Sequence, residues 1–354
     1  MAEAGASIEI KSLYKIFGSD AAHYVKLVKE GMGKAELNQR HGRVLGLKDI
    51  NISMPAGGIQ VVMGLSGSGK STLIRHINRL IDPTAGEVLV DGTDVVKMNE
   101  GELRAFRRSR TAMVFQRFAL LPHRTVLGNT VYGLEVRGMP RAQQNEAATR
   151  WIERVGLKGF ADRYPNQLSG GMQQRVGLAR ALATDAPILL MDEAFSALDP
   201  LIRTDMQSIL LELQKEIRKT VVFITHDLDE ALRLGDRIAI LRDGEIIQQG
   251  TGQDIVLKPA NGYIAKFVQE VNRGRVLLVS SVMSPAGRGG ESDPASGPAI
   301  AETATLEEAL QQMTQAGARA ARVTDAKDRP VGRLTMDAVV SAMVTPVESD
   351  VAGG

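Results

Sequence analysis

The chain of 354 residues contains no cysteine. Disulfides, thiolate metal sites and thiol nucleophiles are therefore excluded, and the composition is compatible with a reducing cytosol. An excess of one charge is also missing, because 43 Lys and Arg stand against 41 Asp and Glu, a formal net charge of +2. That balance argues against a dedicated nucleic-acid-binding protein.

Long apolar runs are absent as well. The longest, such as residues 188–191 and 276–279, fall far below the ~20 residues that a membrane-spanning helix needs. The N-terminus has no basic start followed by an apolar run, so we expect no secretory signal. At roughly 150 residues per domain, the length favours two or more domains.

Apolar periodicity predicts an α/β protein. Residues 8–17 favour a strand, and apolar residues spaced through 25–32 favour a short helix after it. Residues 58–63 form a further short apolar strand. Residues 188–191 and 221–224 are continuous apolar runs, which are typical of strands in a parallel sheet covered on both faces.

The C-terminal part has a different composition. Residues 284–299 are mostly Ser, Gly, Pro and Ala, which bury too little apolar surface to order a segment. We interpret this stretch as part of a flexible linker. The pattern of residues 306–343 then predicts helix, strand, turn, strand and helix, which together form one small α/β unit.

A glycine-rich loop between a predicted strand and a predicted helix gives the strongest local pattern, G-x-x-x-x-G-K-[ST]. Its glycines let successive backbone N–H groups face a phosphate, and the following helix adds the positive end of its dipole. A glycine turn without function is the alternative, and the complete pattern in this context argues against it. The candidate nucleotide-binding residues are Gly64, Ser66, Gly67, Ser68, Gly69, Lys70, Ser71 and Thr72.

Individual roles follow from the chemistry of this loop. Lys70 would contact the β- and γ-phosphates of a nucleotide, and Ser71 would bind Mg²⁺. Thr72 would add a hydroxyl group near the α-phosphate. Nucleotide binding is the function that this loop predicts.

Two carboxylates follow the apolar run at residues 188–191. They stand at the carboxyl end of a predicted strand, which is the edge where open α/β sheets hold ligands. Asp192 fits the magnesium role, and Glu193 could orient the attacking water or accept its proton. An Asp-Glu pair after a strand is more often a helix cap, so hydrolysis is predicted only because the glycine-rich loop is present.

A second glycine motif lies between these two regions, at Leu168-Ser169-Gly170-Gly171-Met172. It resembles the LSGGQ signature of ATP-binding-cassette (ABC) ATPases, with Met172 where the family usually has Gln. The Ser169 hydroxyl and the N–H groups of Gly170 and Gly171 start a helix and could form a second anion site. A capped helix start is the alternative. The resemblance implies a homodimer, in which this loop contacts the nucleotide of the partner subunit.

Further positions match the family in order. Gln116 matches the Q-loop glutamine, which contacts Mg²⁺ or water and couples to the permease, and Asp199 matches the D-loop at the dimer interface. His226 matches the switch histidine that contacts the γ-phosphate. Phe17 matches the aromatic residue that stacks on adenine, with Tyr14 as the alternative. The resemblance thus implies catalytic roles for Glu193, His226 and Gln116, and Mg²⁺ binding by Ser71, Gln116 and Asp192.

The resemblance implies that residues 1–273 form the ABC ATPase domain. This cassette has a mixed, mainly parallel sheet with helices on both faces, and a helical subdomain expected at about 117–180. A helical insertion at about 20–42 is not part of a minimal cassette. Together with residues 191–203, it resembles the ATPase subunits of glycine betaine/proline (quaternary amine) osmoprotectant importers.

This class implies an ATPase that uses ATP and Mg²⁺ and lies peripherally on the cytoplasmic face of the cell membrane. Its partners would be a membrane permease and, indirectly, an external substrate-binding protein, with no nucleic acid. The alternatives are import of another small solute, such as an amino acid, or a non-transport ABC ATPase. One P-loop and no sustained heptads weigh against the latter.

Residues 118–122 could belong to the core or to a groove that receives the permease. Because they closely follow Gln116, we favour the groove.

The remaining chain divides into a linker at 274–299, a module at 300–346 and a tail at 347–354. The module resembles a CBS (cystathionine-β-synthase-type) domain, which members of this importer class carry as a pair. The chain has room for only one. We therefore expect the single module to pair with its copy across the ATPase dimer.

Overall fold

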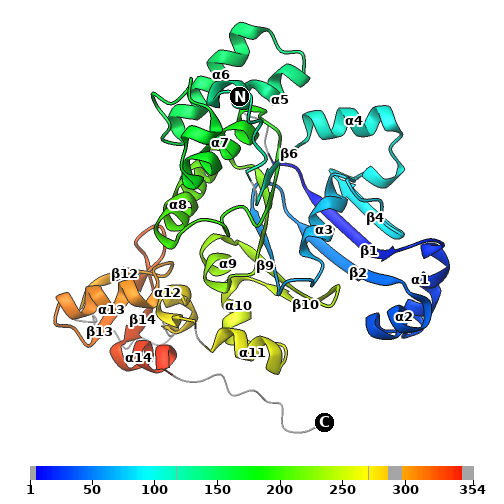
Figure 1. The fold of residues 1–354 in the computed structure, drawn as a ribbon. Helices are drawn as coiled ribbons and strands as arrows, with labels where there is room; N and C mark the ends of the chain where they lie inside the picture. Colours follow the sequence, from blue (N-terminus) through cyan, green and yellow to red (C-terminus); the bar gives the residue numbers. More distant parts are fainter. Residues whose placement is uncertain (1–4, 117, 270, 286–296, 345–354) are drawn as a thin grey trace. The chain divides into compact units, whose positions relative to one another are not determined.

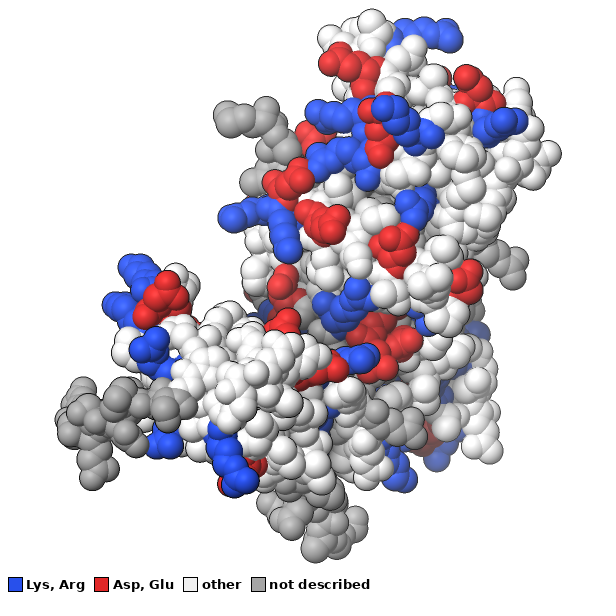
Figure 2. Space-filling view, turned by 90° about the vertical axis from the view of Figure 1, so that its left-hand side faces the viewer, with Lys and Arg blue, Asp and Glu red and all other residues white. Residues whose placement is uncertain are grey.

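The computed structural model describes residues 5–116, 118–269, 271–285 and 297–344. It divides into two compact units, Met1–Gln249 and Gly250–Gly354, which are considered separately (Figure 1). Lys and Arg are interspersed with Asp and Glu on the face shown in Figure 2. No helix in the described ranges is long and apolar enough to cross a membrane.

The larger unit contains a six-stranded sheet in the order β10-β9-β3-β8-β7-β6. The strands from β9 to β6 in this order pair in parallel, and β3, β7 and β8 are buried at every position. The continuous apolar runs therefore form the parallel sheet that they predicted. The strands are β3 (Ile59–Met63), β6 (Thr111–Phe115), β7 (Ile188–Asp192), β8 (Thr220–Thr225), β9 (Arg237–Arg242) and β10 (Glu245–Gly250).

A second, antiparallel sheet lies beside the first in the order β2-β1-β4-β5. Its strands are β1 (Ile8–Phe17), β2 (Val44–Met54), β4 (Ala85–Val90) and β5 (Thr93–Asp94). One hydrophobic core joins both sheets to helix α3 (Lys70–Ile77), and it includes Ile8, Ile10, Val62, Leu73 and Ile74, each at most 1% exposed. This core fixes α3, and hence the loop before it, against the end of β3.

Helices complete the larger unit. Helices α1 (Ala21–Lys29) and α2 (Lys34–His41) lie between β1 and β2 in the sequence, within the predicted insertion. Three helices that pack against one another, α5, α6 and α7, lie together at the top of Figure 1. The remaining bounds are α4 (Glu100–Ser109), α5 (Val126–Val136), α6 (Arg141–Arg154), α7 (Gly170–Ala183), α8 (Pro200–Ile217), α9 (Leu228–Leu234), η1 (Val95–Lys97) and η2 (Pro165–Gln167).

The smaller unit has a four-stranded sheet in the order β11-β14-β13-β12. The helix–strand–strand–helix order predicted for residues 306–343 is present in it as α13, β13, β14 and α14. Its elements are α10 (Gly252–Leu257), α11 (Gly262–Val268), α12 (Arg273–Val276), η3 (Val279–Ser281), β11 (Ser284–Pro285), β12 (Ala299–Ala301), α13 (Leu306–Gln315), β13 (Ala320–Thr324), β14 (Pro330–Thr335) and α14 (Met336–Val344).

The first part of the expected linker is folded, which corrects the sequence interpretation. Residues 274–285 contribute to α12, η3 and β11, and Leu277 and Val279 are fully buried. The apolar residues before position 284 supply the buried surface that the later Ser, Gly and Pro residues lack. Residues 286–296 of the linker, the end of the module at 345–346 and the tail at 347–354 lie outside the described residues.

Candidate active site

The glycine-rich loop connects β3 to α3 in the larger unit. Gly67 and Gly69 have φ angles of +78° and +108°, where side chains are strained. At Gly64 a Cβ would lie 2.1 Å from the carbonyl oxygen of Leu241, and at Gly69 it would lie 2.7 Å from that of Gly46. These glycines are therefore required by both backbone conformation and close packing.

Lys70, the first residue of α3, folds back over this loop. Its side chain is only 4% exposed, and Nζ donates hydrogen bonds to the carbonyl oxygens of Gly64 (2.8 Å) and Leu65 (3.1 Å). Nζ also lies 3.5 Å from Oε1 of Glu193. The Lys70 ammonium is thus held at the centre of the loop, where it would neutralise the charge of a bound phosphate.

Ser71 and Asp192 join the loop to the end of β7. Ser71 Oγ donates a 2.8 Å hydrogen bond to Asp192 Oδ1, and Asp192 Oδ2 lies 3.5 Å from Nη2 of Arg75. Adjacent oxygen ligands of an octahedral Mg²⁺, with bonds of about 2.0–2.1 Å, lie roughly 2.9 Å apart. The two oxygen atoms therefore fit neighbouring positions around Mg²⁺. The described residues include no cluster of three or more His, Cys, Asp or Glu that could hold a metal.

Glu193 occupies the centre of the site. Its backbone N–H donates to the Ile224 carbonyl of β8 (3.1 Å), and its φ of +47° is an unfavourable conformation that surrounding structure must hold in place. Its carboxylate lies 3.4 Å from Nε2 of Gln116 and 3.7 Å from Nδ1 of His226, besides the contact with Lys70. Three elements far apart in sequence therefore bring Lys70, Gln116 and His226 around one carboxylate.

Gln116 follows Phe115, the last residue of β6, which is in register with Asp192 of β7. Its amide nitrogen donates to Ser196 Oγ (3.1 Å) as well as approaching Glu193. Ser196 Oγ in turn donates to the Glu193 carbonyl oxygen (2.9 Å). Through its amide nitrogen Gln116 thus orients the Glu193 carboxylate, and its expected role as a ligand of Mg²⁺ stays a prediction.

Ser169 and Asp199 do not join this cluster within one chain. Ser169 caps α7 by accepting a hydrogen bond from the Met172 N–H (3.4 Å), and Asp199 caps α8 by accepting from Ile202 (3.2 Å). Within one chain, each side chain therefore caps the start of a helix. For Ser169, a helix cap was the alternative to a second anion site.

The two candidate adenine platforms differ in exposure. Tyr14 is 6% exposed and packs in a small core with Ile16 and Leu37, whereas Phe17, at the end of β1, is 39% exposed. A Cβ on Gly46 would lie 2.7 Å from the Phe17 ring, and the Gly46 carbonyl itself lies against the glycine-rich loop. Of these two rings, Phe17 is the one available for stacking.

Arg203 ends the stretch 191–203 that carries part of the resemblance, and no role in the site was predicted for it. Its guanidinium donates to the carbonyl oxygens of Leu198 (3.2 Å) and Ser196 (3.4 Å) and lies 3.3 Å from Oδ2 of Asp227. It therefore links the segment before Asp199 to the residue that follows the switch-histidine position. Its spacing of four residues from Asp199 would suggest a pair with that residue, and it carries no signal for the observed partners.

A glycine-rich phosphate loop between a buried parallel strand and a helix, with carboxylates at the end of another strand of the same sheet, defines a P-loop ATPase. The "ABC transporter" family model matches residues 47–196. ProV of Salmonella typhimurium, a glycine betaine/proline betaine transport system ATP-binding protein, is 51% identical over 282 residues, which are 79% of this chain and 70% of ProV. The chain belongs to the ATP-binding subunits of ABC transporters.

Two further comparisons support this assignment. The trimethylamine N-oxide transport system ATP-binding protein TmoW of Ruegeria pomeroyi is 47% identical over 287 residues, 81% of this chain and 84% of TmoW. The dimeric structure of the ATP-binding cassette MJ0796, in a post-hydrolysis state with ADP and Pi, is 34% identical and has a TM-score of 0.59. It covers 69% of this chain and 98% of MJ0796. The predicted family and cassette fold are confirmed, and the chain is an ATPase that binds ATP.

Proposed function

We propose that this ATPase uses Mg²⁺ and powers import of glycine betaine, proline betaine or a related quaternary amine through a membrane permease. The observation that carries the hydrolytic role is the convergence of Lys70, Gln116 and His226 on Glu193. The solute class rests on the likeness to ProV.

In the proposed reaction the glycine-rich loop and Lys70 bind the β- and γ-phosphates, and Phe17 stacks on adenine. Glu193 orients the attacking water and accepts its proton, while Gln116 holds the carboxylate. His226 contacts the γ-phosphate. When bound, Mg²⁺ would be held by Ser71, Gln116 and Asp192 and would neutralise phosphate charge.

We further propose that two chains form an ATP sandwich on the cytoplasmic face of the membrane. Ser169, Gly170 and Gly171 start α7 outside the cluster around Glu193, so this helix start can serve a nucleotide on a partner subunit. Asp199 would lie at the same interface. The dimeric state of MJ0796 supports this arrangement.

The module at 300–346 is proposed as a single CBS-like domain, and an external binding protein would deliver the solute.

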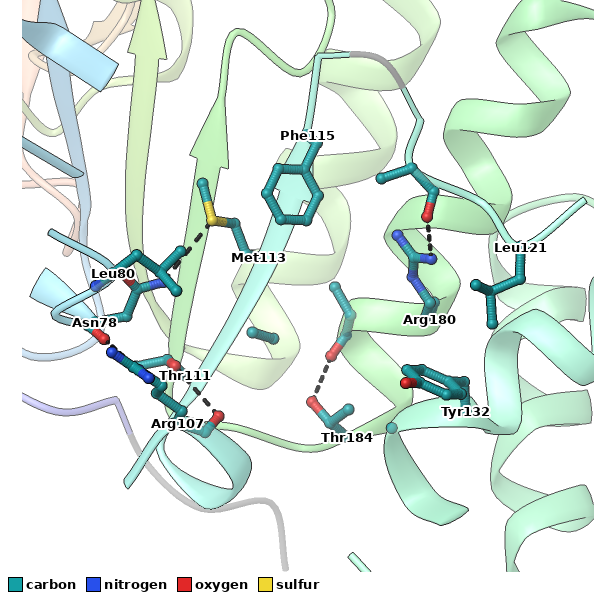
Figure 3. Close-up of a pocket in the computed structure, with 14 residues that line it drawn as sticks. Asn78, Leu80, Arg107, Thr111, Met113, Phe115, Leu121, Tyr132, Arg180 and Thr184 are labelled. Carbon is teal, nitrogen blue, oxygen red and sulfur yellow. Dashed lines mark hydrogen bonds between the residues drawn. The ribbon is translucent and has the colours of Figure 1, made fainter. Parts of the chain in front are cut away.

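A pocket of about 410 Å³ is the proposed docking site for the permease (Figure 3). It is largely apolar and lies between β6 and the helices α5 and α7. Ala119 and Leu121, from the segment expected to form a groove, are among its lining residues. Leu80 and Tyr132, both of them exposed, lie on opposite sides of the pocket in the close-up.

The charges of this pocket indicate the chemistry of its occupant. Arg107 Nε donates to the Asn78 carbonyl oxygen (2.9 Å) and Arg180 Nη1 to that of Ala119 (2.6 Å). Neither guanidinium pairs with a carboxylate in the described part of the chain, and burial lowers the pKa of Arg180. The residues that line the pocket include no acid. An apolar permease segment that carries a carboxylate would complement both features.

Leu80→Arg is expected to reduce permease-coupled solute uptake at least tenfold, because it adds bulk and a third positive charge to the pocket. The ATPase rate of the isolated chain should not change, since Leu80 is 52% exposed and lies outside the catalytic cluster. Val136→Arg, on an exposed position of α5 that does not line the pocket, is the matched control. Normal uptake by the Leu80 variant would exclude this docking site.

The solute class is tested by reconstituting the chain with its permease and binding protein in vesicles. Uptake of labelled glycine betaine should depend on internal ATP and be competed by proline betaine and carnitine. Trimethylamine N-oxide is included because of the likeness to TmoW, and choline and proline test the breadth of the site. If none of these solutes is transported, the solute class is wrong and the ATPase assignment is unaffected.

A further inference from the structure

The helical insertion that a minimal cassette lacks is built directly beside the nucleotide site. Val25 and Val28 of α1 and Leu37 of α2 form a small core with Tyr14 and Ile16 of β1. The same strand ends at Phe17, the proposed adenine platform. Figure 1 shows α1 and α2 at the end of the paired strands β1 and β2. The insertion is therefore fixed to the antiparallel pair β1 and β2, here called the hairpin. This hairpin borders the part of the site where adenine would stack on Phe17.

One side chain of the insertion reaches the phosphate side. Lys34 is the first residue of α2, and its Nζ donates a 3.3 Å hydrogen bond to the carbonyl oxygen of Gly67. Gly67 is one of three consecutive exposed residues, 65–67, which we call the crown of the glycine-rich loop. The hairpin contacts the same loop from another direction, because the Gly46 carbonyl lies against Gly69. The insertion and its hairpin thus hold this loop at two points.

No carboxylate in the described part of the chain compensates the charge of Lys34. Lys70 and Arg75 lie 3.5 Å from Glu193 and Asp192 respectively, so the cations inside the site face acids. In the insertion, Lys26 pairs with Glu30 and Arg40 with Glu36. Lys34 has no carboxylate within ion-pair distance among the residues that the structure describes. Its ammonium is left to act on an anionic ligand of the loop.

We propose that Lys34 is an additional nucleotide-binding residue, through which the insertion raises the affinity of the glycine-rich loop for the polyphosphate of ATP. Its positive charge attracts the phosphates over a short distance through solvent, and its hydrogen bond holds the crown of the loop in shape. This inference rests on the ATP site at Lys70. It gives the insertion a role in nucleotide affinity, separate from the hydrolytic step at Glu193.

Titration of the full-length chain with a fluorescent ATP analogue tests the proposal. At low ionic strength, Lys34→Ala should raise the Kd for ATP about three- to tenfold, and Lys34→Glu should raise it further, because the site is partly exposed and screened. Lys34→Arg should retain most of the affinity. Lys26→Ala, which removes a lysine from the same insertion away from the loop, is the matched control. Thermal melting shows whether each variant is folded.

Two comparisons separate a charge effect from a change in the shape of the insertion. The increase in Kd should be larger for ATP than for ADP, and it should shrink towards none at about 1 M salt, where charges are screened within about 3 Å. Wild-type affinity for ATP in both Lys34→Ala and Lys34→Glu would overturn the proposal. Equal losses for ATP and ADP that salt leaves unchanged would also overturn it. Failure of the wild-type chain to bind ATP would instead contradict the nucleotide site itself.

Discussion

Glu193→Gln is expected to slow ATP hydrolysis about 100- to 1000-fold while leaving ATP binding close to that of the wild-type chain. A general base contributes about 10²- to 10⁴-fold to a rate, and an amide can neither accept the proton nor carry the charge. The amide keeps the size of the carboxylate, so Gln116 and Lys70, which lie around it, should stay in place. Release of phosphate at saturating ATP measures the rate.

The control for this substitution is Glu212→Gln, on an exposed position of α8 outside the site. It removes one carboxylate without touching the cluster and should hydrolyse ATP normally. If ATP closes a dimer and hydrolysis reopens it, Glu193→Gln with ATP should also accumulate as a dimer, which sizing chromatography can detect. Hydrolysis at the wild-type rate by this variant would show that Glu193 is not the base.

The meeting of Asp192, Glu193 and His226 could be expected from the sequence. Each follows a short apolar run, and the carboxyl ends of parallel strands meet at one edge of a sheet. The structure shows why the expectation works here. β7 and β8 are direct neighbours, Asp192 is in register with Ile224, and the Glu193 N–H bonds to the same residue. Neighbouring strands thus deliver residues some 30 positions apart to one place.

The antiparallel sheet was beyond the reach of local patterns. β1 pairs with β4, where Ile8 faces Val90, and the irregular register between β1 and β2 interrupts a simple apolar alternation. Strand pairing over such a separation depends on tertiary packing, because no local turn specifies it.

The contacts of Lys34, Arg75 and Arg203 were also beyond prediction from the sequence. Long cationic side chains are mostly solvated at the surface, so their sequence positions carry little information about partners. Each contact depends on how two distant elements pack: α2 on the loop, α3 on β7, and α8 on the segment after β8. Motifs located the candidate site residues, and packing determined which other residues hold them.

Lys70→Ala should weaken nucleotide binding itself, with a Kd for ATP raised roughly 10- to 100-fold, because a charge-assisted hydrogen bond contributes about 1.5–3 kcal/mol. The effect has two parts. The phosphates lose a cation, and the carboxylate of Glu193, only 3.5 Å from Lys70 Nζ, is left without it and repels the polyanion. Lys97→Ala, far more exposed and outside the site, is the control and should bind normally.

The two parts can be separated with the double variant Lys70→Ala, Glu193→Gln. Removal of the uncompensated carboxylate should restore part of the ATP affinity that Lys70→Ala loses, so the two substitutions should not be additive, as expected for groups in contact. Titration with a fluorescent ATP analogue gives all four values of the cycle. Additive effects would show that Glu193 and Lys70 act on the nucleotide independently, and unchanged binding by Lys70→Ala would remove Lys70 from the phosphate site.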